Sequence, residues 1–146
     1  MDRSEVTGAA ARRFVECVMN GADPSVADDL LTSAHVMHDP LGNDLPPGPD
    51  GARLWAAGMR TAFPDLVYRI DGVITEPSRA AVRLMGGGTH RGVLLEGAPS
   101  GHSFMARAVC WFHFEDGRIA ETWVVPDSLS AALHLGVVER VGPWAG

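Results

Sequence analysis

The chain has 146 residues, of which 46% are hydrophobic and 21% are charged, and this composition is typical of an ordinary folded domain, not of a disordered chain. The net charge is −6 and all 12 basic residues are arginines, which argues against nucleic-acid binding and excludes Schiff-base chemistry on a lysine. No apolar stretch approaches the ~20 residues of a membrane span, and the first residues lack the apolar run of a secretion signal, so we expect no membrane contact.

The length favours a single domain over residues 1–146, with one core that needs no metal or disulfide to hold it together. Cys17 and Cys110 have no metal-binding or redox spacing. They are typical of small buried side chains in a reducing compartment, so we expect a cytoplasmic protein.

The first third of the chain predicts helices. Apolar residues recur at helical spacing from about Glu5 to Met19, and Asn20-Gly21 supplies a stop. Asp23-Pro24 predicts the start of a second helix, with Asp as the N-cap and Pro in the first helical position. A loop rich in Pro and Gly follows from His35, and a third helix is expected over about Ala52 to Ala62.

The remainder predicts a sheet. Alternating or apolar segments indicate strands over Leu66–Ile74, Ala80–Met85, Thr89–Leu95, His102–Phe114 and Arg118–Val125. Gly86-Gly87-Gly88 is expected to break or bend the sheet, and Glu115-Asp116-Gly117 predicts a hairpin turn. A short closing helix is expected over Ser128–Leu135, ended by Gly136.

Helices followed by a long antiparallel meander predict an α+β fold. We expect a cone-shaped α+β barrel, in which a curved antiparallel sheet wraps around the N-terminal helices. The central pocket would lie between the concave face of the sheet and the helices.

The final hairpin carries the first candidate site. Strict alternation places Arg107, Val109, Trp111 and His113 on one face of its first strand, and Ile119, Glu121, Trp123, Val125 and Asp127 on one face of its second. If His113 and Asp127 both face the concave side, an imidazole and a carboxylate meet in an apolar cavity, where burial raises the pKa of the acid.

Each of these residues also has an ordinary structural interpretation. Asp127 directly precedes Ser128-Leu129-Ser130 and suits a helix N-cap. His113 would then be a half-buried strand residue, Trp111 and Trp123 would be core residues, and Glu121 would pair with an arginine such as Arg107.

Two further clusters are weaker. His90, within Thr89-His90-Arg91-Gly92, lines a pocket mouth or belongs to a solvated strand. His35-x-x-His38-Asp39 has a spacing that suits metal ligands, but no further ligand is evident, so a polar loop is favoured and no metal is expected. Glycine-rich dinucleotide, phosphate-loop and nucleophile-elbow motifs are absent.

Several segments, taken together and in order, carry a resemblance that spans roughly residues 10 to 137. They are His38-Asp39-Pro40, Gly48-Pro49-Asp50-Gly51, Ala62-Phe63-Pro64-Asp65-Leu66, Gly88-Thr89-His90-Arg91-Gly92, Gly97-Ala98-Pro99-Ser100-Gly101, Phe114-Glu115-Asp116-Gly117-Arg118-Ile119-Ala120-Glu121, Trp123 with Asp127, and Leu135-Gly136. In this order they resemble the SnoaL-like polyketide cyclases, a family of the nuclear-transport-factor-2-like superfamily.

The resemblance implies a cone-shaped barrel that assembles through the convex face of its sheet into a homodimer or homotetramer. It implies an enzyme of antibiotic biosynthesis that closes the last ring of an aromatic polyketide by an intramolecular aldol reaction, without metal or cofactor. It also implies that Asp127 is the general acid/base and that His113 lines the pocket.

On this basis we expect Asp127 and His113 to be catalytic, with His113 or His90 as the donor that stabilises an enolate. Substrate contacts are expected from His90, Trp111, Trp123, His38, Phe63, Phe104 and Arg107, the aromatic members forming walls for a planar polycycle. Relatives on this fold also include hydroxylase components, isomerases, epoxide-opening hydrolases and dehydratases, so a cyclase or isomerase is the first hypothesis and a hydroxylase component or epoxide-opening hydrolase the second. A non-catalytic module that binds small molecules is a third hypothesis.

Overall fold

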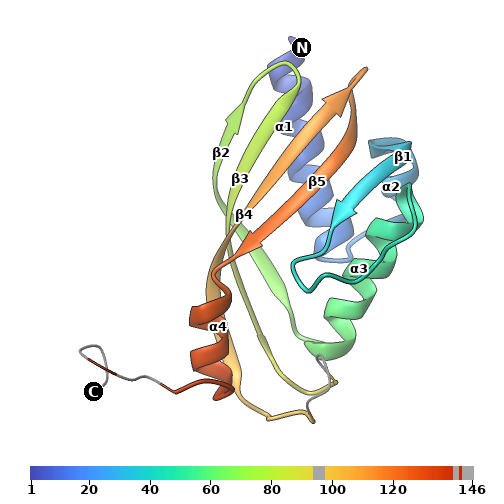
Figure 1. The fold of residues 1–146 in the computed structure, drawn as a ribbon. Helices are drawn as coiled ribbons and strands as arrows, with labels where there is room; N and C mark the ends of the chain where they lie inside the picture. Colours follow the sequence, from blue (N-terminus) through green and yellow to red (C-terminus); the bar gives the residue numbers. More distant parts are fainter. Residues whose placement is uncertain (94–97, 140–141, 143–146) are drawn as a thin grey trace.

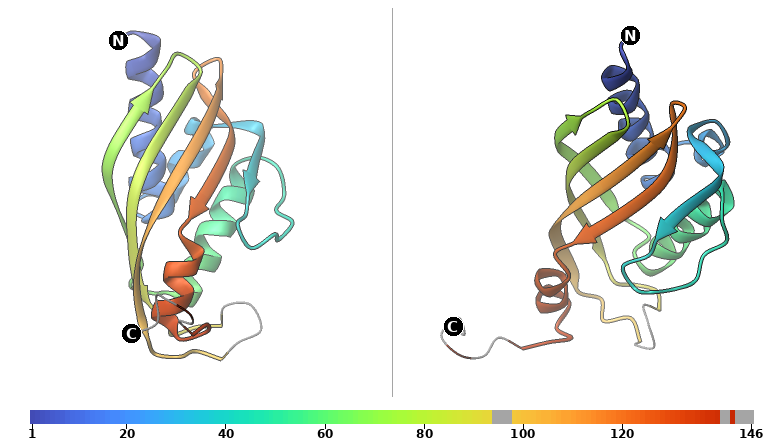
Figure 2. Two further views of the ribbon diagram at one scale, coloured as in Figure 1. Left: turned by 60° about the vertical axis from the view of Figure 1, so that its left-hand side comes forward. Right: turned by 45° about the horizontal axis from the view of Figure 1, so that its top comes forward.

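Within the described residues, which are 1–93, 98–139 and 142, five strands form one curved sheet with helices against its concave face (Figure 1). The structure is a computed structural model. The strand order is β1-β5-β4-β3-β2, and Figure 2 shows the strands twisting across the layer of helices. This arrangement confirms the expected α+β cone.

Four strands form the expected antiparallel meander. They are β2 (Val67–Thr75), β3 (Arg79–Thr89), β4 (Ser103–Glu115) and β5 (Arg118–Pro126). The turn between β4 and β5 contains Asp116 and Gly117, both with positive φ, as the hairpin prediction requires.

The loop expected from His35 begins only after His38, because Leu31–His38 forms strand β1. This strand pairs in parallel with β5 and lies at the edge of the sheet, with His38 beside Trp123. A parallel partner from the other end of the chain leaves no hairpin signal in the local sequence.

The helices lie close to their predicted bounds. Helix α1 (Arg3–Arg13) begins with a capping box between Asp2 and Glu5 and continues as a π-helix over Phe14–Met19. A short 3₁₀ helix (Pro24–Val26) capped by Asp23 leads into α2 (Ala27–Leu30), and the further helices are α3 (Pro49–Ala62) and α4 (Ser128–Leu135). Among the described residues, none of these helices combines the length and the apolar composition that a bilayer crossing requires.

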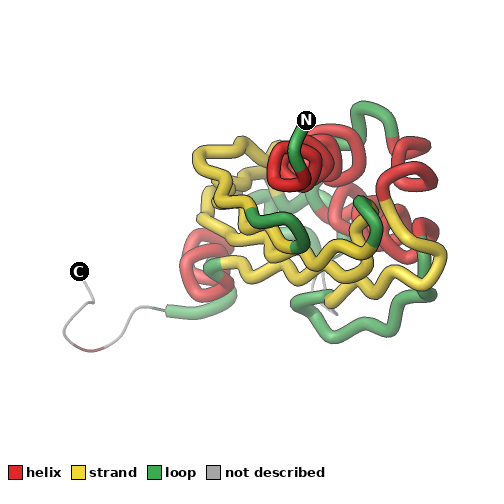
Figure 3. The backbone as a smooth tube through the Cα atoms, turned by 90° about the horizontal axis from the view of Figure 1, so that it is seen from above, coloured by secondary structure: helices red, strands yellow, loops and turns green. Residues whose placement is uncertain are grey.

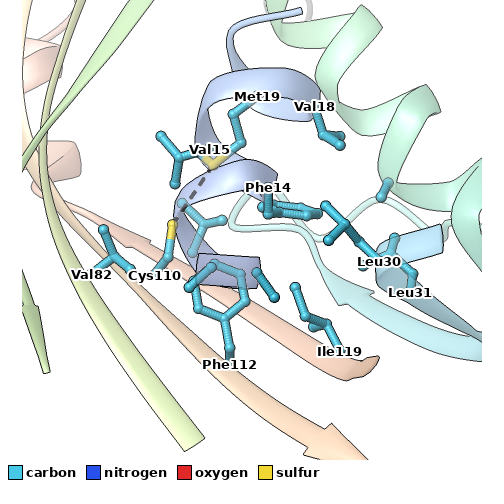
Figure 4. Close-up of a cluster of buried hydrophobic side chains, with 14 of the residues drawn as sticks. Phe14, Val15, Val18, Met19, Leu30, Leu31, Val82, Cys110, Phe112 and Ile119 are labelled. Carbon is cyan, nitrogen blue, oxygen red and sulfur yellow. Dashed lines mark hydrogen bonds between the residues drawn. The ribbon is translucent and has the colours of Figure 1, made fainter. Parts of the chain in front are cut away.

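The core lies between the helices and the concave face of the sheet. Seen from above, α1 runs along this concave side (Figure 3). The ring of Phe14 meets that of Phe112 edge-on at 5.4 Å, and the thiol of Cys110 donates to Sδ of Met19 at 3.9 Å (Figure 4). Burial raises the pKa of the Cys110 thiol to about 12, so this cysteine is the inert core residue that its sequence context predicts.

Of the two expected effects of the glycine run, a break or a bend, the break does not occur in β3. The strand continues through Gly86, Gly87 and Gly88 and ends at Thr89. A Cβ atom on Gly86 would lie 3.0 Å from the ring of Tyr68, and one on Gly88 would lie 3.1 Å from Cβ of Phe63. The missing side chains therefore leave room for aromatic rings on the concave side.

The strand expected over Thr89–Leu95 is likewise corrected, because the chain leaves the sheet after Thr89 and has no regular structure over residues 90–93. Its last part, Leu94-Leu95, lies outside the described residues.

Two glycines in α3 test how closely this helix packs against the loop that contains Pro46. A Cβ atom on Gly51 would overlap the carbonyl oxygen of Pro46, whereas one on Gly58 would meet nothing within 4 Å. We expect Gly51→Ala to lower the free energy of unfolding by about 1–3 kcal/mol because of this overlap. Gly58→Ala should raise it by about 0.5–1 kcal/mol, because alanine favours the helix. Urea denaturation followed by circular dichroism measures both, and equal effects would contradict the seating of α3.

Candidate functional site

The two faces of β4 divide the candidate residues. Alternate residues from Phe104 to Phe114 are buried or half-buried beneath the helices. The other set, Arg107, Val109, Trp111 and His113, stands on the outer face, where Trp111 is 43% exposed. The alternation is therefore confirmed, but the set that contains His113 faces away from the helices.

The predicted meeting of His113 and Asp127 is wrong. The Asp127 N–H donates to the carbonyl oxygen of Arg107 at 2.8 Å. His113 lies opposite Glu121 in the β4–β5 ladder, near the other end of the hairpin. The strand between Arg107 and His113 is about 20 Å long. No side chain spans that distance, so these two groups do not share a cavity within this chain.

Asp127 acts as the N-cap of α4. Its Oδ1 accepts the backbone N–H of Ser130 at 3.0 Å, and the residue is exposed. The N-cap interpretation of the sequence is therefore confirmed. A catalytic role for the same carboxylate remains a prediction.

An aromatic and charged cluster lies on the outer face beside the edge strand. The His38 ring stacks on the Trp123 ring at 4.7 Å, nearly parallel, and His38 Nε2 lies 2.6 Å from Oε2 of Glu121. Glu121 thus pairs with His38 and not with Arg107 as suggested. A register shift between His113 and Phe114 turns Glu121 outward while Ile119 is buried, so Ile119 does not share the face of Glu121 as predicted.

The metal-like spacing of the early segment does not produce a shared site. In the strand, His35 is buried on the inner side, and His38 faces outward. The Asp39 carboxylate instead accepts the backbone N–H groups of Leu41 and Asn43. No group of three or more His, Cys, Asp or Glu side chains that could hold a metal occurs in the part of the chain that the structure describes.

Three of the predicted site residues do come together on the inner side. The Phe63 ring lies 5.7 Å from that of His90 and 4.9 Å from that of Phe104. His90 is only 4% exposed, and Leu66 and Leu135 pack against Phe63. We call His90, Phe63 and Phe104, with these two leucines, the inner aromatic cluster.

Three buried ring nitrogens have no hydrogen-bond partner among the described residues: His35 Nδ1, Trp55 Nε1 and His90 Nε2. An unmatched buried polar group costs roughly 1–3 kcal/mol, so such atoms call for a bound molecule or an ordered water. His90 and His35 belong to clusters that the sequence singles out, whereas Trp55 lies within the helix predicted over about Ala52 to Ala62 and has no such signal.

Helix α3 links Trp55 to the inner aromatic cluster. Trp55, Met59 and Phe63 follow one another at the spacing that lines one helix face, so Trp55 and Phe63 are about 12 Å apart. Trp55 and Met59 also line a cavity of about 330 Å³ between α3 and the loop after β1, with Leu45 and Val93 among its other walls. Met59 packs against the inner aromatic cluster as well. Met59 therefore lies between this cavity, which Asp39, Asn43 and Asp44 also line, and the inner aromatic cluster.

His35 is held neutral on the same side of the sheet. Its Nε2 lies 2.9 Å from Oγ1 of Thr122, and both residues are fully buried. Burial lowers the pKa of His35 from 6.5 to about 4, against a smaller opposing effect of the Glu121 carboxylate. The inner side therefore offers uncharged polar atoms in an apolar setting, which suits a neutral organic ligand.

A family model described as SnoaL-like polyketide cyclase matches residues 9–135 of the chain. A search of curated protein sequences gave no match.

Solved structures share the fold over most of the chain. TsrD from Streptomyces laurentii is 25% identical, with a TM-score of 0.80 over 94% of this chain and 99% of that one. IdmH from Streptomyces antibioticus, a candidate polyketide cyclase, is 23% identical, with a TM-score of 0.73 over 88% and 96%. AclR from Streptomyces galilaeus, a candidate hydroxylase, is 24% identical, with a TM-score of 0.73 over 92% and 83%.

The lowered pKa of His35 makes stability depend on pH. The unfolded chain takes up a proton at this residue below pH 6.5, whereas the folded chain does so only near pH 4, so stability is lost as the pH falls through this window. We expect His35 to contribute a loss of about 2–3 kcal/mol between pH 7.5 and 4.5. Urea denaturation at both pH values measures it. His35→Gln, which cannot titrate, should show a correspondingly smaller loss, and an equal loss in both proteins would refute the assignment.

Proposed function

The chain belongs to the SnoaL-like polyketide cyclase family, and we propose that it closes a ring in a polyketide-like natural product by an intramolecular aldol-type reaction. The proposal is carried by two buried ring nitrogens that have no hydrogen-bond partner among the described residues, Nε2 of His90 beside the ring of Phe63 and Nε1 of Trp55. Trp55 Nε1–H can only donate a hydrogen bond, and a polyketide supplies carbonyl oxygens that accept.

The proposed reaction needs only proton transfer and positioning. A base removes a proton from a methylene flanked by carbonyl groups, which is unusually acidic, and the resulting enolate carbon bonds to a ketone carbon of the same molecule. The ketone oxygen then takes a proton and becomes a hydroxyl group. Electrons balance without an oxidant, a reductant or a cofactor.

An apolar interior supports such a reaction in two ways. Hydrogen-bond donors act more strongly on a developing enolate where water is excluded, because the local dielectric is low. Aromatic walls also hold a flexible chain in the folded pose in which its reacting carbons meet, and this removes much of the entropic barrier. Phe63 and Phe104 are the walls that we assign to this role.

We assign the base to Asp127, the residue that matches the family's Trp-x-x-x-Asp pattern. The N-cap uses Oδ1, which leaves Oδ2 for a substrate proton. Asp127 starts α4, whose Leu135 packs into the inner aromatic cluster. His113 stands on the outer face near the other end of the hairpin, about 20 Å from Asp127, and the proposal gives it no part in this step.

Asp127→Asn separates the two roles of this side chain. Asparagine caps a helix about as well as aspartate but cannot take the proton, so we expect an unchanged urea midpoint and a loss of turnover of about 100-fold or more. Turnover is measured as ring closure of a panel of ring-open aromatic β-keto esters, by chromatography and mass spectrometry. Asp127→Ala is the control that loses the cap as well, at a cost of about 1 kcal/mol.

Full activity in Asp127→Asn would remove this residue from the mechanism. The same assay in ¹⁸O-labelled water and ¹⁸O₂ distinguishes the other hypotheses. Label built into a new bond would indicate an epoxide-opening hydrolase or a hydroxylase, and binding without any turnover would indicate a non-catalytic module.

We further propose that the outer face of the sheet joins copies of this chain into a homodimer or homotetramer. Apolar side chains gather on this face, and several are largely exposed: Val36, Met105, Val109, Trp111 and Val125. Exposed apolar groups that gather on one surface favour association in water. In this proposal the protein acts in the cytoplasm on a small-molecule intermediate of antibiotic biosynthesis.

Val125→Glu tests the association. Val125 is 61% exposed, so the substitution leaves the core intact but places a charge in the proposed interface. We expect a shift towards monomer in sedimentation velocity, with at least about a tenfold weaker association. Leu54→Glu on the helical side, where Leu54 is 55% exposed, is the matched control and should not change the oligomeric state. A wild-type monomer would contradict the proposal.

A further inference from the structure

His90 lies in a small hydrogen-bonded frame just after β3. Its backbone N–H donates to the carbonyl oxygen of His102 at 2.9 Å, and its own carbonyl oxygen accepts from Gly101 N–H at 2.9 Å. These two bonds hold the backbone of His90 beside the segment before β4. They therefore fix the place from which the imidazole projects.

Ser100 contacts one nitrogen of the imidazole, Nδ1, with two of its atoms. Its backbone N–H donates to Nδ1 of His90 at 3.2 Å, and its hydroxyl oxygen lies 3.2 Å from the same atom. That hydroxyl oxygen also accepts the backbone N–H of His102 at 3.2 Å, which leaves its own proton free to point at Nδ1.

This frame determines which nitrogen carries the proton. A backbone N–H can only donate, so Nδ1 must accept, and the proton of the neutral ring is on Nε2. Nε2 is buried and has no partner among the described residues, in a side chain that is 4% exposed. The ring therefore carries an N–H donor with no partner among the described residues, in a buried position beside Phe63.

We propose that His90 is the residue that donates a hydrogen bond to a carbonyl or enolate oxygen of the ligand, and that Ser100 is the positioning residue that keeps its proton on Nε2. The identity of the oxygen as the one on which charge develops during ring closure rests on the proposed function. In this role His90 stabilises the oxygen as a hydrogen-bond donor, and it does not act as the base.

The surroundings of His90 select the kind of oxygen. The buried hydrophobic side chains packed with Phe63 are Ala62, Leu66 and Leu135, and none of these three side chains can accept a hydrogen bond. A ligand hydroxyl would accept from Nε2–H but would bury its own proton without an acceptor, at a cost of roughly 1–3 kcal/mol. A ketone or enolate oxygen carries no proton and has no such cost. The site is therefore specific for the keto or enolate form.

Nitrogen NMR tests the proton position without any ligand. In ¹⁵N-histidine-labelled protein, long-range ¹H–¹⁵N correlation should show His90 with a protonated Nε2 and an unprotonated Nδ1, and His90→Phe identifies its signals. Ser100→Ala keeps the backbone N–H and should keep this pattern. Ser100→Pro removes both the N–H and the hydroxyl and should allow the other tautomer. A proton on Nδ1 in the wild-type protein, or the wild-type pattern in Ser100→Pro, would overturn the role of Ser100.

A matched pair of probes tests the acceptor. Anthraquinone-2-sulfonate carries two ring carbonyls, and anthracene-2-sulfonate has a similar shape without them. By titration calorimetry we expect His90→Phe to weaken binding of the quinone by about three- to tenfold and to leave the anthracene unchanged. His90→Gln, whose amide N–H stands near the position of Nε2, should restore much of the difference. Equal losses for both probes, or no quinone preference in the wild type, would overturn the proposal.

These measurements and the turnover assay fail independently. If the NMR pattern and the quinone preference hold while no ring closure is found, the donor site stands and the proposed reaction falls. If ring closure is found with a proton on Nδ1 of His90, the reaction stands and the donor site falls.

Discussion

Burial of one face of β4 determines on which side of the sheet the candidate residues of this strand stand. The helices cover the face that carries Phe104, Cys110 and Phe112, and burying side chains of this size contributes roughly 1.5–3 kcal/mol each. Once this face is turned inward, the intervening residues must face outward, because the side chains of a strand alternate. The same constraint that builds the core therefore separates His113 from the inner aromatic cluster.

The alternation could be read from the sequence, but its direction could not. Both faces of the last hairpin carry large apolar side chains, such as Trp111 and Trp123 outside and Phe112 inside, whereas two of the inner positions are the small residues Ala106 and Ala108. Hydrophobicity alone therefore favours neither face. Helix periodicity and the capping residues gave the helices to within a few residues, because those signals are local. Strand β1 escaped detection because its partner lies far away in the sequence.

The inner side has a consistent chemical character. Trp55, His35 and His90 place polar ring atoms among aromatic and aliphatic groups, and the structure describes no protein partner for three of those atoms. The resemblance predicts Phe63 and Phe104, whereas only its burial without a partner among the described residues marks Trp55, because a tryptophan on a helix face is most often a core residue. A site of this kind is visible only when the hydrogen bonds of each buried atom are followed to their ends.

Strand β1 and its partner β5 lie far apart in the sequence, and this separation affects how the chain folds. Leu31 lies beside Ile119 and His38 beside Trp123, so most of the chain lies between the paired residues of this edge. Contacts so distant along the chain carry a large loop-closure cost and slow folding. We therefore expect the strand that brings His35 against Thr122 to pair after the β4–β5 hairpin has formed.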